Sequence, residues 1–192
     1  VYGGNALAVY STELKPQMAS VRVKAMKPLD ADTARSGEII SFPFEIAHDE
    51  FKTKIIEKKT EDIDGVGLEA ANFVIGGGRG IGSAEAYEKL EEIAADFGGA
   101  TGASRAVCDN GWAPASKQIG LTGRVIAPNI YVAVAISGAS QHMAGCYGAE
   151  TIVAINKDQE ANIFRESDFG VVGDWNDVLP GFINKLKELK SG

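Results

Sequence analysis

From about residue 72 onward, the chain alternates short apolar runs with longer segments of helical spacing. The apolar runs predict strands at 72–75, 100–103, 125–127, 130–136, 151–155 and 169–172. Helical spacing predicts helices at 84–97, 105–109 and 175–190. The run 130–136 has β-branched residues, an aromatic ring and no charge, which is typical of a strand buried on both faces. Strands that alternate with helices through short turns predict a parallel α/β sheet.

The first part of the chain has a different pattern. Strand-like segments at 7–11 and 20–26 are separated by Pro16 and followed by Pro28, and they hold too little apolar material for a core of their own. We therefore expect residues 1–60 to be the C-terminal remnant of a first α/β domain with its linker, or to pair with a partner chain. Residues 61–192 are expected to form a second domain. Since the sequence begins at Val1 rather than Met, we expect a fragment or a processed product.

Polar side chains follow nearly every predicted strand of the second domain. These are Arg79, Ser104, Arg105, the stretch from Ser137 to His142, Asn156 and Asp174. Because the carboxyl ends of parallel strands lie along one edge of a sheet, these side chains can meet there and line a ligand crevice. The plainer alternative is a series of ordinary strand–turn–helix units with an incidental histidine.

A glycine-rich turn follows the first strand of this domain. The offsets of a dinucleotide fingerprint fit only from Gly78 to Ser83, with serine in the last glycine position, so an ordinary tight turn is an equal interpretation. Arg79 within it suits either a phosphate or charged ring or a surface ion pair.

Three further residues have two interpretations each. Arg105, after Ser104 at a helix start, suits an anion or an electron-rich planar ring, or it pairs with a nearby acid. Asp174 can cap the last helix or accept hydrogen bonds from ribose hydroxyls. His142 would by itself more often be structural, but its place beside Gln141 at a strand end favours ligand contact.

Composition narrows the function classes. A net charge of −7 and a pI near 4.9 argue against nucleic acid or an anionic membrane surface as the main partner. No apolar run is long enough to span a membrane. Two cysteines without CxxC spacing and two histidines make a structural zinc site a poor fit and favour a reducing cytoplasm or organelle matrix. Neither a Ser–His–Asp arrangement nor the paired carboxylates of a glycosidase is evident.

Several motifs in order closely resemble the α subunit of electron transfer flavoproteins. They are GGGRG at 76–80, GASRAV at 102–107, GLTGR at 120–124, ISGASQHMAG at 136–145 and VAINKD at 153–158. The resemblance extends over residues 62–192, and segments 1–11 and 21–28 look like the end of that subunit's first domain. It implies a Rossmann-like fold, with helices on both faces of the sheet, that binds FAD.

The resemblance also implies a set of cofactor contacts. Arg105 would lie against the isoalloxazine ring, and Thr122 would hydrogen-bond near the flavin N5. His142 would lie near the C2 carbonyl, with Gln141 beside it. The pyrophosphate and ribityl chain would be held by Arg79 and by the stretch from Ser137 to Ser140. The residues implied for cofactor binding are, in full, Arg79, Ser104, Arg105, Gln118, Thr122, Ser137, Gly138, Ala139, Ser140, Gln141, His142, Asn156 and Asp174, the last two at the adenosine end.

The implied function is electron transfer without bond-making chemistry on a substrate. A heterodimer with a β subunit would carry electrons from flavin dehydrogenases, such as the acyl-CoA dehydrogenases of fatty acid oxidation, to a quinone- or ferredoxin-linked acceptor. A guanidinium and an imidazole beside the ring would stabilise the negative charge of the singly reduced flavin. Whether the parent complex is a simple or a bifurcating carrier is left open. The expected compartment is a bacterial or archaeal cytoplasm, or else the mitochondrial matrix.

Two residues depart from the family pattern. Leu121 stands where the family commonly has glutamine, and Ser140 where a β-branched apolar residue is frequent. Both changes bear on the redox potential. Two other functions remain alternatives: a nucleotide- or NAD-binding enzyme domain on a similar fold, and an interaction module that has lost its cofactor.

Overall fold

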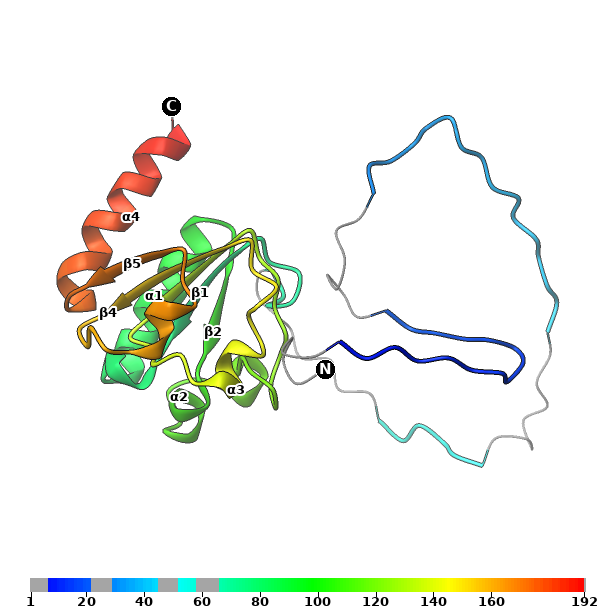
Figure 1. Ribbon diagram of the computed structural model, residues 1–192, viewed down its shortest axis with the longest axis horizontal. Helices are drawn as coiled ribbons and strands as arrows, with labels where there is room; N and C mark the ends of the chain where they lie inside the picture. Colours follow the sequence, from blue (N-terminus) through cyan, green and yellow to red (C-terminus); the bar gives the residue numbers. More distant parts are fainter. Residues whose placement is uncertain (1–6, 22–28, 45–51, 58–65, 192) are drawn as a thin grey trace.

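The computed structural model describes residues 7–21, 29–44, 52–57 and 66–191, and its centre is a five-stranded parallel sheet (Figure 1). The strands lie side by side in the order β2-β1-β3-β4-β5, and every neighbouring pair is parallel. This confirms the predicted α/β class. The strands are β1 (Phe73–Gly77), β2 (Ala100–Ala103), β3 (Ile130–Val134), β4 (Thr151–Asn156) and β5 (Phe169–Val172).

The strand order reverses direction between β1 and β3. From β1 the chain crosses to β2 on one side, and it then returns to place β3 on the other side of β1. The loops that leave the carboxyl ends of β1 and β3 therefore diverge. In open parallel sheets, ligands bind in the crevice that such a reversal leaves.

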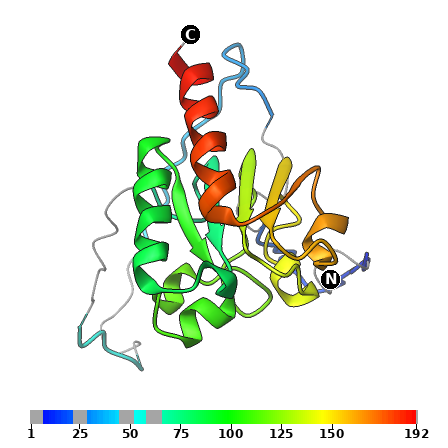
Figure 2. The ribbon, with the colours of Figure 1, turned by 90° about the vertical axis from the view of Figure 1, so that its left-hand side faces the viewer.

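Two layers of side chains cover the two faces of the sheet. On one face pack α1 (Ala84–Asp96), α2 (Arg105–Asp109) and α4 (Trp175–Ser191). Figure 2 shows α1 in green and α4 in red in front of that face. The other face is covered by α3 (Ser140–Met143), the 3₁₀ turn η5 (Asn162–Arg165) and irregular segments. Helices thus lie on both faces, as expected, and within the described residues the long ones are on the face that α1 and α4 cover.

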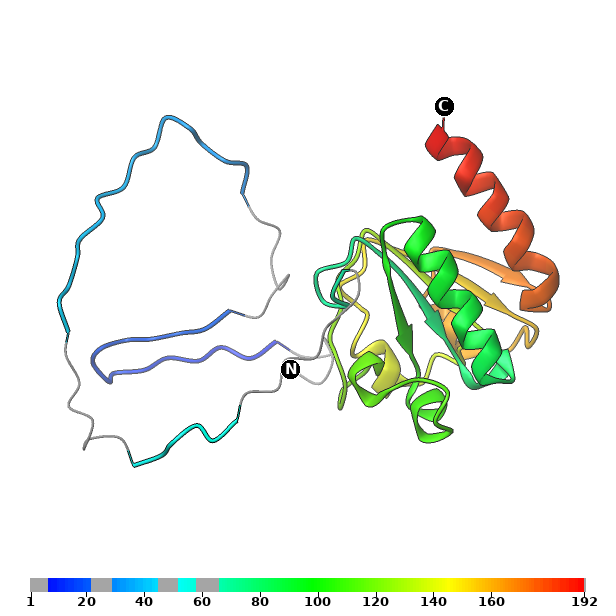
Figure 3. The same cartoon turned by 180° about the vertical axis from the view of Figure 1, so that it is seen from behind.

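Local signals explain where the long helices begin and end. The Ser83 hydroxyl accepts a hydrogen bond from the Ala86 amide at 3.2 Å and caps α1. The chain leaves that helix through Gly98, whose φ of +64° suits glycine. Figure 3 shows α1 from the opposite side to Figure 1. Pro180 lies inside α4, so the Asn176 carbonyl one turn earlier receives no hydrogen bond from it. Among the described residues, no helix is long and apolar enough to cross a bilayer.

Two details of the strand prediction were wrong. Segment 125–127 is not a strand: it lies outside the sheet, and the Ile126 amide donates to the Gly145 carbonyl at 2.7 Å. The strand expected at 130–136 ends at Val134, because Ala135 has a φ of +53°. That conformation is costly for a non-glycine residue and turns the chain out of the sheet.

The strand predicted at 7–11 is also absent from the part of this region that the structure describes. Residues 7–21, 29–44 and 52–57 contain neither helix nor strand, and they are exposed. Residues 22–26 of the segment predicted as a strand at 20–26 lie outside the described residues. The packed core begins at Leu68. The division of the chain into domains at about residue 60 stays a prediction.

Candidate ligand crevice

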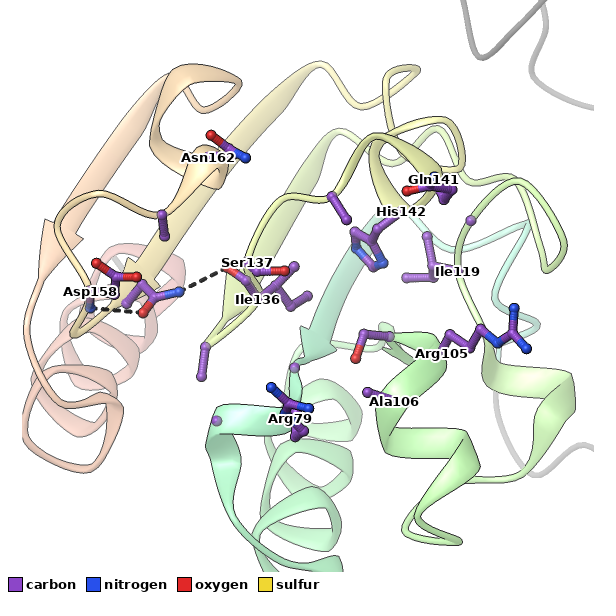
Figure 4. Close-up of a pocket in the computed structure, with 18 of the residues that line it drawn as sticks. Arg79, Arg105, Ala106, Ile119, Ile136, Ser137, Gln141, His142, Asp158 and Asn162 are labelled. Carbon is purple, nitrogen blue, oxygen red and sulfur yellow. Dashed lines mark hydrogen bonds between the residues drawn. The ribbon is translucent and has the colours of Figure 1, made fainter.

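A crevice of about 940 Å³ opens at the carboxyl edge of the sheet (Figure 4). Its walls come from the loops after β1, β2, β3 and β4, together with segment 118–122. Sites for small molecules and cofactors measure roughly 300–1,000 Å³, so this one suits a large ligand. Ten of the sequence-predicted site residues line it: Arg79, Ser104, Arg105, Gln118, Thr122, Ser137, Ala139, Gln141, His142 and Asn156.

The crevice lies at the reversal of strand order, where two backbones touch. The Gly78 amide donates to the Val134 carbonyl at 2.8 Å. A Cβ atom on Gly78 would lie 2.0 Å from the Ala135 carbonyl oxygen, so only glycine fits there. Gly78 and Ala135 both line the crevice. The glycine-rich turn therefore lets the ends of β1 and β3 approach each other at the base of the crevice. This close approach explains Gly78 without a dinucleotide-binding fingerprint.

His142, on α3, is a buried polar side chain of the crevice wall. It is 7% exposed, and its Nε2 atom lies 2.8 Å from the Tyr131 hydroxyl. Its Nδ1 atom is buried without a hydrogen bond of acceptable geometry, although the backbone of Ile119 lies close enough to favour the charged ring weakly. Burial lowers the pKa of His142 to about 4, so the imidazole is neutral at physiological pH.

Ser104 and the two arginines come from the turns after β2 and β1. The Ser104 hydroxyl is buried in the crevice wall without a hydrogen-bond partner in the described structure. The Arg105 Nε lies 3.5 Å from the Asp109 carboxylate, and both side chains are mostly exposed. Both interpretations of Arg105 are thus compatible with its position, since it forms an ion pair and also lines the crevice. Among the described residues, Arg79 forms no ion pair.

Segment 118–124 is hydrogen-bonded to α3. The Leu121 amide donates to the Gln141 carbonyl at 2.7 Å, and the Gln118 amide group donates to the Thr122 hydroxyl at 3.0 Å. Leu121 itself lines the crevice and is 62% exposed.

Asn156, at the end of β4, connects the loops after β3 and β4 in the crevice wall. Its side-chain amide donates to the Ile136 carbonyl at 2.9 Å, and its carbonyl oxygen accepts from the Asp158 amide at 3.0 Å (Figure 4, dashed lines). A side-chain amide has two donors and two acceptor positions. One of each remains for a ligand, while the other pair holds the loops after β3 and β4 in register.

Three predicted site residues do not line the main crevice. Gly138 has a φ of +79° and lies in the turn between β3 and α3. The Ser140 hydroxyl donates to the Gln141 side chain at 3.3 Å. Asp174 caps α4 by accepting from the Asn176 amide at 2.9 Å. It borders a small adjoining hollow of about 40 Å³ that shares Gly80, Ala135, Asn156 and Lys157 with the crevice.

Sequence reasoning missed part of the wall contributed by the segment after β4. Lys157, Asp158, Glu160 and Asn162 line the crevice, and Figure 4 shows Asp158 and Asn162 on the side away from Arg105. The motif NKD at 156–158 was recognised, but only its asparagine was assigned a role. The position of Lys157 and Asp158 directly after a strand was the signal that could have identified them.

The wall chemistry suits a long ligand with anionic and planar parts. Arg79, Arg105 and Lys157 offer positive charge, which exceeds the negative charge of Asp158 and Glu160 in the same wall. Two buried polar atoms of residues that line the crevice, the Ser104 hydroxyl and His142 Nδ1, make no hydrogen bond of acceptable geometry within the described part of the chain. Buried polar groups are normally paired, so these two fit a bound group that supplies their partners. The residues present therefore fit a cofactor with a polar, oxygen-bearing ring.

Comparison with known proteins points the same way. Residues 67–147 match a family model described as the electron transfer flavoprotein FAD-binding domain. The chain is 42% identical over 190 residues to an electron transfer flavoprotein subunit alpha of Thermoanaerobacterium thermosaccharolyticum, covering 98% of this chain and 58% of that protein.

The Bacillus subtilis subunit of the same name is 41% identical over 191 residues, and the mitochondrial one of Arabidopsis thaliana 38% over 197. These alignments cover 98% and 99% of this chain, and 58% and 54% of the relatives. The chain thus spans little more than half the length of the relatives it matches.

Proposed function

Since the chain belongs to the electron transfer flavoprotein α-subunit family and carries its FAD-binding domain, we propose that it holds FAD in the crevice at the carboxyl edge of the sheet and serves as an electron carrier. The observation that carries this proposal is the pair of buried, unpaired polar atoms, Ser104 Oγ and His142 Nδ1, in the wall of that crevice. FAD, when bound, supplies the redox chemistry. The residues of the chain bind it, orient it and set its electrostatic surroundings.

The flavin end would lie between the turn after β2 and α3. Arg105 would turn from its exposed ion pair with Asp109 toward the ring, which costs little because an exposed pair contributes at most about 1 kcal/mol. Thr122 would direct its hydroxyl to the ring, held in place by Gln118. Gln141 and His142 would face the pyrimidine side, and Ser104 would meet the ring or the ribityl chain.

The remainder of the cofactor would extend along the carboxyl ends of β1, β3 and β4. Arg79 and the turn of Ser137, Gly138, Ala139 and Ser140 would face the pyrophosphate and ribityl chain. Asn156 would use its remaining donor and acceptor at the adenosine end. Lys157 adds a positive charge to that end of the crevice. Asp174, which borders the adjoining hollow, would reach a ribose hydroxyl while it continues to cap α4.

The wider role extends beyond the part of the relatives that this chain covers. We propose a heterodimer with a β subunit that takes electrons from flavin dehydrogenases, including those of fatty acid oxidation, and passes them to a quinone- or ferredoxin-linked acceptor. The chain itself would perform no bond-making reaction. Residues 1–60 would complete a separate domain, and the proposed compartment is the cytoplasm or, as the alternative, the mitochondrial matrix.

The test is a visible absorption titration of the purified chain with FAD, alone and with a β subunit, followed by stepwise reduction with dithionite. Saturable binding of one FAD per chain, with reversible reduction, is the expected result. A variant with Ser104→Ala and His142→Ala together should bind FAD at least tenfold more weakly, since two hydrogen bonds of about 1 kcal/mol each are lost. Binding of NAD in place of FAD, or no flavin binding with the β subunit present, would overturn the proposal.

A further inference from the structure

The contact between Tyr131 and His142 joins the sheet to the crevice. Tyr131 lies on β3 and is fully buried on the face of the sheet that α3 covers. Its hydroxyl lies 2.8 Å from His142 Nε2, and the two ring centroids are 6.1 Å apart. No other hydrogen bond of this hydroxyl is found within the described part of the chain. The buried phenol therefore has one available partner.

Gly76 makes room for this contact. It pairs with Ala133 on β3, so Tyr131, two residues earlier, lies diagonally across from it on the same face. A Cβ atom on Gly76 would lie 2.3 Å from the Tyr131 hydroxyl oxygen. Glycine at this position of a buried strand therefore lets the phenol extend toward the carboxyl edge of the sheet, where it reaches the imidazole.

The direction of the hydrogen bond can be argued from the proton that the phenol carries. Buried donors are normally paired, and the acceptor within reach of the Tyr131 proton is His142 Nε2. Burial also raises the pKa of Tyr131 well above its usual value, so the phenol keeps that proton. A neutral imidazole that accepts at Nε2 carries its own proton on Nδ1. Within the described residues, Nδ1 is buried in the crevice wall without a hydrogen bond of acceptable geometry.

We infer that Tyr131 is a positioning residue: it fixes His142 as the Nδ1–H tautomer, so that the crevice presents a hydrogen-bond donor to an oxygen of the bound flavin. This inference rests on the proposed function for the identity of the ligand. With the opposite tautomer, Nδ1 would offer a lone pair and would repel a carbonyl oxygen. The residue that decides between these two states does not itself line the crevice.

Nitrogen-15 NMR of the histidine rings tests the tautomer directly. The chain has only two histidines, His48 and His142, and the variant His142→Gln assigns the signals. In the free wild-type chain at pH 7, we expect the proton on Nδ1 of His142. In Tyr131→Phe the ratio of the Nδ1–H to the Nε2–H form should fall roughly fivefold, as loss of one ordinary hydrogen bond implies. Tyr87→Phe is the matched control, since it removes another buried phenol hydroxyl on the opposite face of the sheet.

The FAD titration separates this inference from the proposed function. Tyr131→Phe should bind FAD several-fold more weakly than wild type and shift the midpoint potential of the bound flavin, while Tyr87→Phe matches wild type in both. If wild type binds FAD but His142 carries its proton on Nε2, or Tyr131→Phe leaves the tautomer unchanged, the inference is wrong and the proposed function stands. If wild type fails to bind FAD, the proposed function is wrong, and the role inferred for the donor is wrong with it, whatever the tautomer.

Discussion

The amide of Gly78 is hydrogen-bonded to the carbonyl of Val134 at 2.8 Å, directly where the order of strands reverses. The first turn of the α/β unit is therefore fastened to the end of the third strand. This hydrogen bond lies at the base of the crevice. It can form because glycine has no Cβ atom to collide with the Ala135 carbonyl oxygen.

Substitution of Gly78 should disrupt this contact. In Gly78→Ala, the new Cβ atom would meet the Ala135 carbonyl oxygen, so β1 and β3 must move apart at their ends. We expect a loss of about 1–3 kcal/mol in the free energy of unfolding, measured by urea denaturation, and reduced FAD affinity. Gly181→Ala is the control: this exposed position in α4 has open space around it, and alanine there should leave the protein unchanged or up to about 1 kcal/mol more stable. Equal effects of the two substitutions would contradict the close approach at Gly78.

His142 should make stability depend on pH in a specific window. Its pKa is about 4 in the folded chain and about 6.5 in an unfolded one, so the unfolded state gains a proton first as the pH falls. Stability should therefore be lost from about pH 6.5 downward and level off below pH 4, by roughly 3 kcal/mol in all. The measurement is the difference in unfolding free energy between wild type and His142→Gln from pH 4 to pH 8. A difference that does not vary with pH would show that the ring is not buried as described.

Two substitutions of Asp174 should distinguish its role in capping α4 from its role in cofactor binding. Hydrogen bonds from Asn176 lower the pKa of this carboxyl group, so its contribution is present at neutral pH and is lost only as the pH falls through that lowered value. Asp174→Ala should weaken both FAD binding and the start of α4. Asp174→Asn should keep the cap, since asparagine caps equally well, while it loses the charge. Thermal melts and FAD titrations of the two variants check this, and undiminished FAD retention in Asp174→Ala would reject the ribose contact.

Arg105 should affect the bound flavin more than the fold. Its ion pair with Asp109 is exposed, so Arg105→Ala and Asp109→Asn should each change the unfolding free energy by less than about 1 kcal/mol. Arg105→Ala should shift the reduction potential of bound FAD to a more negative value, because a positive charge near the reduced ring is lost. Arg105→Lys should retain part of that charge effect without the planar stacking. A potential unchanged in Arg105→Ala, measured by dithionite titration with a reference dye, would place the guanidinium away from the ring.

The apolar runs predicted the sheet because its central strands β1, β3 and β4 are short apolar segments that are almost entirely buried. The run at 130–136 shows the limit of that signal. Hydrophobicity continues through Ala135 and Ile136, but the strand ends at Val134 because close contact with the turn after β1 holds Ala135 at a positive φ. Segment 125–127 has equally strand-like residues, yet it pairs with no strand of the sheet within the described residues. These outcomes depend on which strands pair, and a single stretch of sequence carries little information about pairing.

The crevice was predictable for a related reason. Polar residues at the ends of parallel strands must share one edge, so Arg79, Ser104, His142 and Asn156 could be grouped without coordinates. The bond from Tyr131 to His142 could not, since it depends on the space above Gly76 and on a side chain reaching diagonally across two strands. Lys157 and Asp158 occupy the same kind of position as Asn156 and could have been included.

The outer strand β5 has a practical consequence for work with the isolated chain. Phe169, Val171 and Val172 are 65%, 41% and 58% exposed on a strand that pairs, among the described residues, only with β4. An apolar strand edge of this kind is a template for pairing with another molecule. Concentrated samples should therefore self-associate with time, and light scattering would rise before any loss of the flavin spectrum. FAD titrations of dilute samples at two protein concentrations would show whether self-association changes the measured affinity for FAD.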